Sequence, residues 1–419
     1  MQDWAGWLLL LFSFSIVLMW KSIRDDTKVV HAIWFCLVVH HAVGFLNVYI
    51  PDASTFYWNA YYLSVSPELE WLRLAASSEP EWLPFSSNGA FNYINALGFL
   101  YGAFGASLIF GEELSILAFV LSCVVLVKLA DHLYLRRFRV GIILLFGLLP
   151  SAVIFRSATL RESWQALFFL LSVYSAIRLR KCPSILNVSF FLMPIFCMSL
   201  LHHGLAKYAV YLAVIGLYWS IFASNKNVRW SRHLRFLFAG ILIFCVIKLA
   251  QTIGWNMTID QALEHAAGIR RSLLSYEVRT VYSFMLDTSS VSGLVTTIPM
   301  IFVQYMFAPF PWQVENIKDI WALLESILRL LLLFFSISSW WRSSGEVRSC
   351  YNFLIIAVLG LELVWSLGTV NWGTAIRHHV PGYSVIVLLG APGLIQFMRE
   401  LYFGMFGRGK ASGKLDEQV

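Results

Sequence analysis

Residues 29–50, VVHAIWFCLVVHHAVGFLNVYI, form an apolar run that ends at PDASTFYWNAYY (51–62). A helix needs about 20 apolar residues to cross the hydrocarbon core of a bilayer, and this run is long enough. We therefore predict a membrane-spanning helix, with Asp52 where the chain leaves the membrane. A carboxylate at that depth, beside an aromatic-rich segment, is a candidate for function. The alternative is that Asp52 caps the next helix and the aromatic residues form an interfacial belt.

The composition of the whole chain predicts the same class. Of 419 residues, 58% are hydrophobic and 13% are charged, which excludes a soluble globule and predicts an all-α, polytopic integral membrane helix bundle. The net charge of +7 does not indicate a nucleic-acid partner, because Lys and Arg occur in short clusters between apolar runs. The six cysteines fall in apolar runs or predicted cytoplasmic loops, so we expect neither disulfides nor a metal cluster.

Hydropathy and charge together predict about 11 transmembrane helices. The first lacks the basic segment of a cleavable signal peptide, so we expect it to be retained. Lys and Arg are more frequent on one side of this arrangement, which places the N-terminus outside and the C-terminus in the cytoplasm. The predicted spans are 4–20, 29–50, 113–134, 140–155, 163–179, 185–201, 206–223, 234–253, 320–340, 352–368 and 380–396.

Two further apolar stretches do not fit this topology as full spans. Residues 91–110 contain several glycines, and residues 294–310 are interrupted by Pro299. If both crossed the membrane, everything between them would be inverted, so we predict interfacial helices in two large outer loops, 51–112 and 254–319. Spans and loops make a single transmembrane domain, 1–403, followed by a flexible cytoplasmic tail, 404–419.

Polar groups recur at the predicted outer ends of the helices. Ionisable groups at membrane depth are costly, so clusters of them require a partner. The fork of an arginine matches the oxygens of a phosphate, which predicts binding of a lipid phosphate on this face. The groups at these helix ends are Arg156, Arg161, Glu162, His203, Arg377 and His378.

Other interpretations of these groups stay open. Arg161 and Glu162 would form a structural ion pair in one alternative, and Arg377 would be an anchor at the interface in another. The second outer loop offers a competing phosphate clamp. It contains Arg270, Arg271 and Arg279.

Several polar residues are predicted to serve the interior of the bundle. His40 and His41 lie inside a span, and Glu325 and Arg329 are expected to pair because they lie four residues apart on one helix face. The chain has no HExxH, Walker loop, dinucleotide-binding GxGxxG or EF-hand spacing. Nucleotide chemistry and a metal are therefore not indicated, and no cofactor is expected.

The order of these features resembles the N-terminal core of the GT-C membrane glycosyltransferases. The resemblance covers about residues 45–180, with an Asp at the outer end of an early helix, a loop ending in YGAFGAS (101–107), and then LP (149–150) and LRE (160–162). Two later motifs, PFPW (309–312) and NWGTAIRH (371–378), are similar to multi-spanning proteins of bacterial polysaccharide clusters, including Wzy-like O-antigen polymerases. The soluble C-terminal domain that is usual in the family is absent, as is the paired acidic motif of some members.

The resemblance implies transfer of glycosyl units from a polyprenyl-phosphate or polyprenyl-diphosphate donor to an acceptor glycan, at the periplasmic face of a bacterial inner membrane. Asp52 is then expected to act as the general base, with Glu162 as the second catalytic carboxylate and the cations on the lipid phosphate. Tyr57 is a candidate to stack on a sugar ring. Other polysaccharide-assembly membrane proteins are candidate partners.

Two other functions compete with this one. A flippase or transporter of lipid-linked sugars should have charges along a path from both faces and often has repeated halves, whereas here the polar clusters lie on one predicted face. A membrane acyltransferase that modifies polysaccharide would need a histidine central to a membrane funnel. His40 and His41 support that alternative.

Overall fold

The computed structural model describes residues 3–46, 48–65, 89–221, 240, 264, 267–268, 270–272 and 280–406. Within these ranges the secondary structure is helical, and one isolated β-bridge is present. The helices are α1 (Trp4–Ile16), η1 (Val17–Met19), α2 (Lys21–Arg24), α3 (Thr27–Phe45), α4 (Pro51–Val65), α6 (Gly89–Phe104), α7 (Leu108–His132), η2 (Arg136–Phe138), α8 (Arg139–Gly147), α9 (Pro150–Arg156), α10 (Glu162–Lys181), α11 (Ile185–Leu201), α12 (His203–Ile221), α15 (Val291–Phe307), η3 (Pro311–Gln313), α16 (Ile317–Arg342), α17 (Gly345–Gly368) and α18 (Trp372–Phe406).

Six helices of the described part are long and apolar enough to cross a membrane, namely α3, α7, α12, α16, α17 and α18. Helices α8 and α9 pass the same test together, although they are bent by 69° at the break between them. Helices α1, α11 and α15 are apolar but shorter. Helix α10 occupies the predicted span 163–179 but carries charged residues at both ends. The predicted span 234–253 lies outside the described residues, apart from residue 240.

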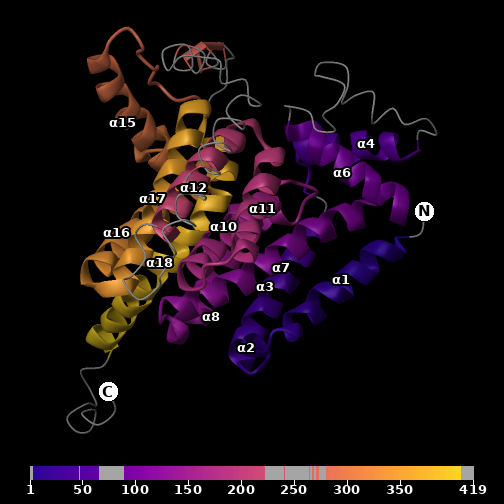
Figure 1. Ribbon diagram of the computed structural model, residues 1–419. Coiled ribbons are helices and arrows are strands. Elements are labelled where there is room, and N and C mark those ends of the chain that lie inside the picture. The colour runs from indigo at the N-terminus through magenta and orange to yellow at the C-terminus, as the bar shows by residue number, and fades with distance from the viewer. Residues whose placement is uncertain are drawn as a thin grey trace.

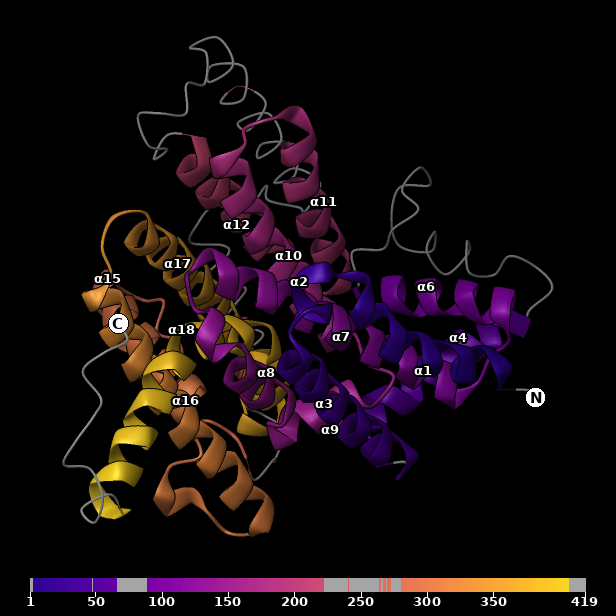
Figure 2. The ribbon, with the colours of Figure 1, turned by 90° about the horizontal axis from the view of Figure 1, so that it is seen from below.

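The helices form an elongated bundle with a distinct group at one end. Figure 1 shows α4, α6 and the start of α1 together, whereas α2 and the last turns of α18 lie at the opposite end. We call these the α4 end and the α2 end. In the view of Figure 2, α3, α7, α8 and α10 lie between the group of α1, α4 and α6 and the group of α15 to α18. One hydrophobic core extends from Ile16 to Leu394, and a smaller cluster packs α4 and α6 against α1 and α7.

The predicted span 29–50 ends early in the structure. Helix α3 stops at Phe45, and Pro51 begins the separate helix α4. Proline suits the first turn of a helix and disfavours helical backbone in the residue before it, which explains the break. The predicted extent of this span, to residue 50, is therefore wrong, because its helix stops at Phe45. Asp52 lies in the first turn of α4, where the helix dipole favours a carboxylate.

The predicted span 140–155 is also interrupted, again at a proline. Leu149 is extended, with φ −61° and ψ 123°, and Pro150 is the first residue of α9. The interruption leaves carbonyl groups at the end of α8 without helical partners. Arg156 Nη1 donates a hydrogen bond to Phe146 O, at 2.7 Å, and so satisfies one of them.

Helix α7 begins at Leu108, earlier than the predicted 113. Gly105 has φ +91°, which ends α6, and Ser107 Oγ accepts a hydrogen bond from Phe110 N at 3.0 Å, which caps α7. Glu112 and Glu113 consequently lie inside the helix. Glu113 is buried at 2.9 Å from His41, so one of the two predicted interior histidines has a carboxylate partner.

Helix α18 begins at Trp372 and not at the predicted 380. Asn371 Oδ1 accepts a hydrogen bond from Thr374 N at 2.7 Å, which caps this helix. The placement of Arg377 and His378 in a loop is therefore wrong, because both lie in the first turns of α18. A β-bridge between Val281 and Asn371 ties the second predicted outer loop to the start of this helix.

The predicted ion pair between Glu325 and Arg329 is wrong. Glu325 Oε1 accepts a hydrogen bond from Ser151 N at 2.8 Å, and Arg329 Nη1 donates one to Met306 O at 2.5 Å. Ser151 lies in the first turn of α9 and Met306 in the last turn of α15, where backbone groups lack helical partners. Each of the two charged side chains thus forms a hydrogen bond with a backbone group at the end of another helix, and they do not pair with each other.

Candidate functional site

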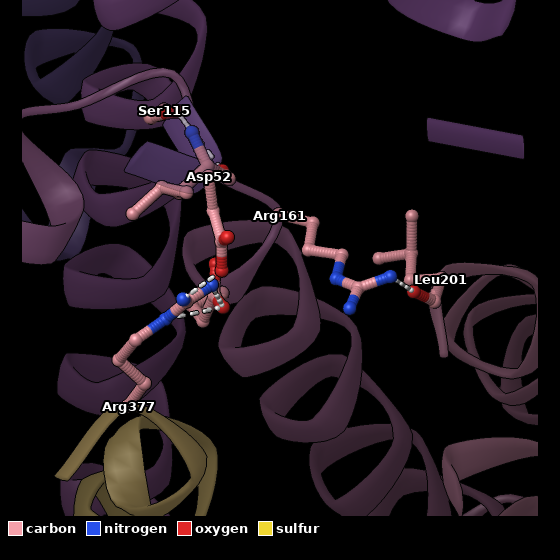
Figure 3. Close-up of polar contacts among 7 residues, drawn as sticks. Asp52, Ser115, Arg161, Leu201 and Arg377 are labelled. Carbon is pink, nitrogen blue, oxygen red and sulfur yellow. Dashed lines mark hydrogen bonds and ion pairs between the residues drawn. The ribbon is translucent and has the colours of Figure 1, made fainter. Parts of the chain in front are cut away.

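Three residues that are distant in sequence meet at the α4 end of the bundle. Asp52 comes from α4, Glu162 from α10 and Arg377 from α18, and Figure 3 shows the Arg377 guanidinium directed at the carboxylates. Arg377 Nη1 donates to Asp52 Oδ2, while Nε donates to Glu162 Oε1 at 3.1 Å and Nη2 donates to the same oxygen. One guanidinium thus bridges two carboxylates. We call these three residues the carboxylate–arginine cluster.

The members of this cluster differ in their access to solvent. The side chain of Glu162 is 3% exposed, that of Arg377 is 16% exposed and that of Asp52 is 56% exposed. Glu162 is therefore the interior end of the cluster, and Asp52 is the carboxylate that a soluble group can reach. Glu162 Oε2 is buried without a hydrogen-bond partner in the described residues.

Local contacts fix the segment that delivers Glu162. Ser115 Oγ of α7 donates to Leu160 O at 3.1 Å and accepts from Leu160 N at 3.3 Å, just before α10 begins. A serine that pairs with both backbone groups of one residue holds that residue against α7. The first turn of α10, with Glu162 in it, is positioned by this contact.

Arg161 points away from the cluster, although it is adjacent to Glu162. Its Nη1 donates to Leu201 O at 2.9 Å, at the end of α11, and its guanidinium lies 5.6 Å from the ring of Phe56 (Figure 3). Burial lowers the pKa of Arg161, nearby Glu162 raises it, and Arg377 lowers it further. The alternative ion pair of Arg161 with Glu162 is not formed. Arg161 Nε is buried without a hydrogen-bond partner in the described residues.

His202 immediately precedes α12 and is close enough to Arg161 and Arg377 to feel their charges. Its Nδ1 accepts a hydrogen bond from Gly204 N at 3.0 Å, so the ring caps the helix and carries its proton on Nε2. Burial, followed by the charges of Arg161, His203 and Arg377, lowers the pKa of His202 to about 3. The ring is therefore neutral at physiological pH.

The two histidines predicted for the site, His203 and His378, make no hydrogen bond or ion pair with the three cluster residues in the part of the chain that the structure describes. His378 is stacked on Trp365 at 3.9 Å between ring centroids, and its Nδ1 lies 2.7 Å from Thr369 Oγ1. His378, which follows Arg377 in α18, therefore packs against residues at the end of α17. His203, by contrast, is exposed at the beginning of α12.

Two predicted phosphate ligands are committed to backbone carbonyls elsewhere. Arg156 is fully buried against Phe146, inside the bundle. Arg270 is 1% exposed, and it donates to Phe284 O at 3.0 Å and to Thr369 O at 2.9 Å, beyond the end of α17. Burial lowers the pKa of Arg270 to about 10, so the group stays charged at neutral pH.

The remaining predicted residues lie apart from the cluster. Arg271 is exposed and does not form a clamp with the buried Arg270. Tyr57 lines a separate cleft of about 390 Å³, together with Asp3 and Glu112. Arg279 lies outside the described residues. In the ranges that the structure describes, no group of three His, Cys, Asp or Glu residues is arranged to hold a metal ion.

The contacts that sequence analysis missed carry little sequence signal. They include the carbonyl of Leu201, the hydroxyl of Ser115 and the ring of Phe155, which lies 5.7 Å from the Arg377 guanidinium. Serine and phenylalanine are common in membrane helices, so neither residue type indicates a site. Comparison of the chain with protein-family models, curated proteins and solved structures finds no match. The resemblance to GT-C glycosyltransferases therefore stays a prediction.

Proposed function

We propose that this protein is a membrane glycosyltransferase or polysaccharide polymerase that moves glycosyl units from a polyprenyl-(di)phosphate donor to an acceptor glycan. The observation that carries the proposal is the carboxylate–arginine cluster, in which an exposed carboxylate is held by a guanidinium that is anchored on a buried carboxylate. This cluster lies at one end of a bundle of apolar helices, which suits a substrate that is carried on a lipid.

The exposed position of Asp52 suits a general base. In the proposed step the acceptor hydroxyl oxygen bonds to the anomeric carbon and gives its proton to Asp52. The bond from that carbon to the phosphate oxygen breaks, and its electron pair stays on the phosphate. A positioned carboxylate contributes on the order of 10²- to 10⁴-fold to such a step. Arg377 Nη1 orients the carboxylate from the other side.

The contacts of the second carboxylate favour a role beside that of the base. Glu162 accepts two hydrogen bonds from Arg377 and is buried. We therefore propose Glu162 as a positioning residue that fixes the guanidinium. Arg161, whose Nε is free of protein partners among the described residues, is the candidate to bind the leaving phosphate.

The topology belongs to the same proposal. We infer eleven spans with the N-terminus outside and the C-terminus inside, so that the α4 end faces the periplasm of a bacterial cell. Support comes from the basic residues of the chain, which concentrate in the segments assigned to the cytoplasm. The positions of α1 and α18 fit this orientation, because α1 begins at the α4 end and α18 finishes at the α2 end.

A flippase of lipid-linked sugars is the second candidate, and one observation favours it. Ionisable groups lie buried among the spanning helices, including Glu362 of α17, which is 2.7 Å from His379 of α18. Such groups inside a membrane protein often mark a transport path. They also occur as interior hydrogen bonds, and His379 Nε2 is bonded to Tyr305 O at 3.1 Å.

One experiment separates the two candidates. The full-length protein is purified, reconstituted in liposomes and given a polyprenyl-diphosphate-linked oligosaccharide. A transferase should release polyprenyl diphosphate and give glycans extended by whole repeat units on a gel. A single added unit would identify a transferase that is not a polymerase. Movement of a fluorescent lipid-linked sugar across the bilayer without any transfer product would reject the enzyme and support the flippase.

A further inference from the structure

A second polar site lies at the α2 end, far along α18 from the carboxylate–arginine cluster. Segments η2, α16 and α18 enclose a pocket of about 330 Å³. Arg137, Arg342, Ser338 and Ser339 line its polar side, and Glu400 is the one carboxylate among the lining residues that the structure describes. We call it the two-arginine pocket. Its other wall is apolar, with Phe138, Phe335 and Phe397.

The two arginines of this pocket form no ion pair with a carboxylate among the described residues. Arg137 and Arg342 are both exposed. Their neighbour Arg139 contrasts with them, because it pairs with both Asp26 and Asp131 and is buried. Among the described residues Arg139 thus has two carboxylate partners, whereas Arg137 and Arg342 share a lining with Glu400 but form no ion pair with it.

The surroundings favour a lipid phosphate over a free one. Helix α16, which provides Arg342, has an apolar outer face next to the pocket, where Phe334 is 63% exposed and Ile337 is 51% exposed. Trp341 is 71% exposed and adjoins Arg342, as expected where a helix reaches the membrane surface. A phosphate in the pocket would therefore sit at headgroup level, with an apolar path for acyl chains directly beside it. A small inorganic ion would make no use of the three phenyl rings.

We propose that the two-arginine pocket binds the headgroup phosphate of an anionic glycerophospholipid, with the guanidiniums of Arg137 and Arg342 on the phosphate oxygens. The serine hydroxyls donate to the glycerol or headgroup oxygens, and the acyl chains lie along α16. Basic pockets between membrane helices commonly hold anionic headgroups, and each Arg or Lys near an anionic surface favours binding. This inference is independent of the proposed enzymatic function.

The test measures lipid binding to the intact protein. The full-length protein in a neutral detergent is titrated with phosphatidylglycerol or with phosphatidylcholine of the same acyl chains, and bound lipid is counted by native mass spectrometry. Wild type is expected to prefer phosphatidylglycerol. The double variant Arg137→Gln/Arg342→Gln is expected to bind phosphatidylglycerol roughly tenfold more weakly and phosphatidylcholine unchanged. Equal binding of the two lipids by wild type would overturn the proposal.

Two further variants distinguish the pocket from general surface charge. Arg24→Gln/Arg178→Gln removes the same charge from exposed positions outside the pocket, and it should keep the lipid preference. Ser338→Glu keeps both arginines but places a carboxylate in the pocket, so it should lose the preference even if the double variant folds poorly. Loss of preference in Arg24→Gln/Arg178→Gln, or its retention in Ser338→Glu, would reject the pocket. Displacement of the lipid by millimolar inorganic phosphate would identify a free-anion site and also reject it.

Discussion

The two ends of the bundle use arginine in opposite ways. At the α4 end a single guanidinium, Arg377, is shared by carboxylates from two other helices. At the α2 end Arg137 and Arg342 line one pocket and have no carboxylate ion pair in the described part of the chain. In the first arrangement the arginine is neutralised by protein carboxylates and one carboxylate faces outward, which suits proton transfer. The second leaves positive charge facing outward, which suits an anionic ligand.

The largest effect that tests this comparison is expected for Arg377→Ala. It should abolish glycan extension, and it should also lower the free energy of unfolding by roughly 3–5 kcal/mol, because Glu162 would be left as a buried charge without its partner. Thermal unfolding and the extension assay measure the two effects. Arg377→Lys keeps the charge but loses the fork, so it should be impaired less.

A matched double variant separates the structural effect from the functional one. Arg377→Gln/Glu162→Gln removes both charges, so it should recover most of the lost stability and remain inactive. If the double variant regained activity along with stability, Arg377 would be a purely structural residue.

The apolar helices could be predicted from sequence because their length and composition suffice, whereas the cluster could not. Arg377 lies 325 residues from Asp52 and 215 residues from Glu162. No local pattern relates these positions, so the sequence indicated that each of them is at a helix end but not that they meet. The contacts of Arg377 with two carboxylates were not foreseen, and the lipid-phosphate role expected for it stays a prediction.

A smaller effect is expected where an arginine serves only the fold. Arg270→Gln should lower the free energy of unfolding by about 2–3 kcal/mol, since charge-assisted hydrogen bonds to the Phe284 and Thr369 carbonyls are lost. Activity per folded molecule should stay at the wild-type value. Arg271→Gln is the control, and it should change stability by less than about 0.5 kcal/mol because the side chain is exposed. Loss of activity in correctly folded Arg270→Gln would return Arg270 to the list of phosphate ligands.

The next effect is the dependence of stability on pH. The folded-state pKa of His202 is lowered to about 3 from 6.5, so the unfolded chain binds the proton more readily. The stability that this group contributes is therefore complete above about pH 6.5 and is lost as the pH falls toward 3. His202→Asn keeps a side chain that can cap α12 but does not titrate, so its midpoint of unfolding should depend less on pH between about 6.5 and 4. The exposed His31→Asn should retain the wild-type dependence, and an equal flattening in both variants would contradict the assignment.

Sequence analysis failed in a consistent way at the helix boundaries. Pro51 begins a new helix directly after the run 29–50, whose own helix stops at Phe45. Pro150 begins a new helix inside the run 140–155, and Asn371 caps α18 ahead of the predicted span 380–396. Apolar composition predicts which segments cross the membrane. It does not show where a helix is interrupted when the residues at the interruption are also apolar. The caps and prolines at these positions were visible in the sequence, and the rule that a proline suits the first turn of a helix would have placed two of the three boundaries.

The most direct test of the proposed role of the carboxylate–arginine cluster is glycan extension by Asp52→Asn. Asparagine keeps the shape of the side chain and an oxygen for Arg377 Nη1, but it cannot take a proton. The variant should fold, insert and bind the lipid-linked donor, while turnover falls by about 10²- to 10⁴-fold. Asp3→Asn, which changes a carboxylate in the separate cleft, is the matched control and should keep its activity. Turnover near that of wild type in well-folded Asp52→Asn would contradict the assignment of Asp52 as the base.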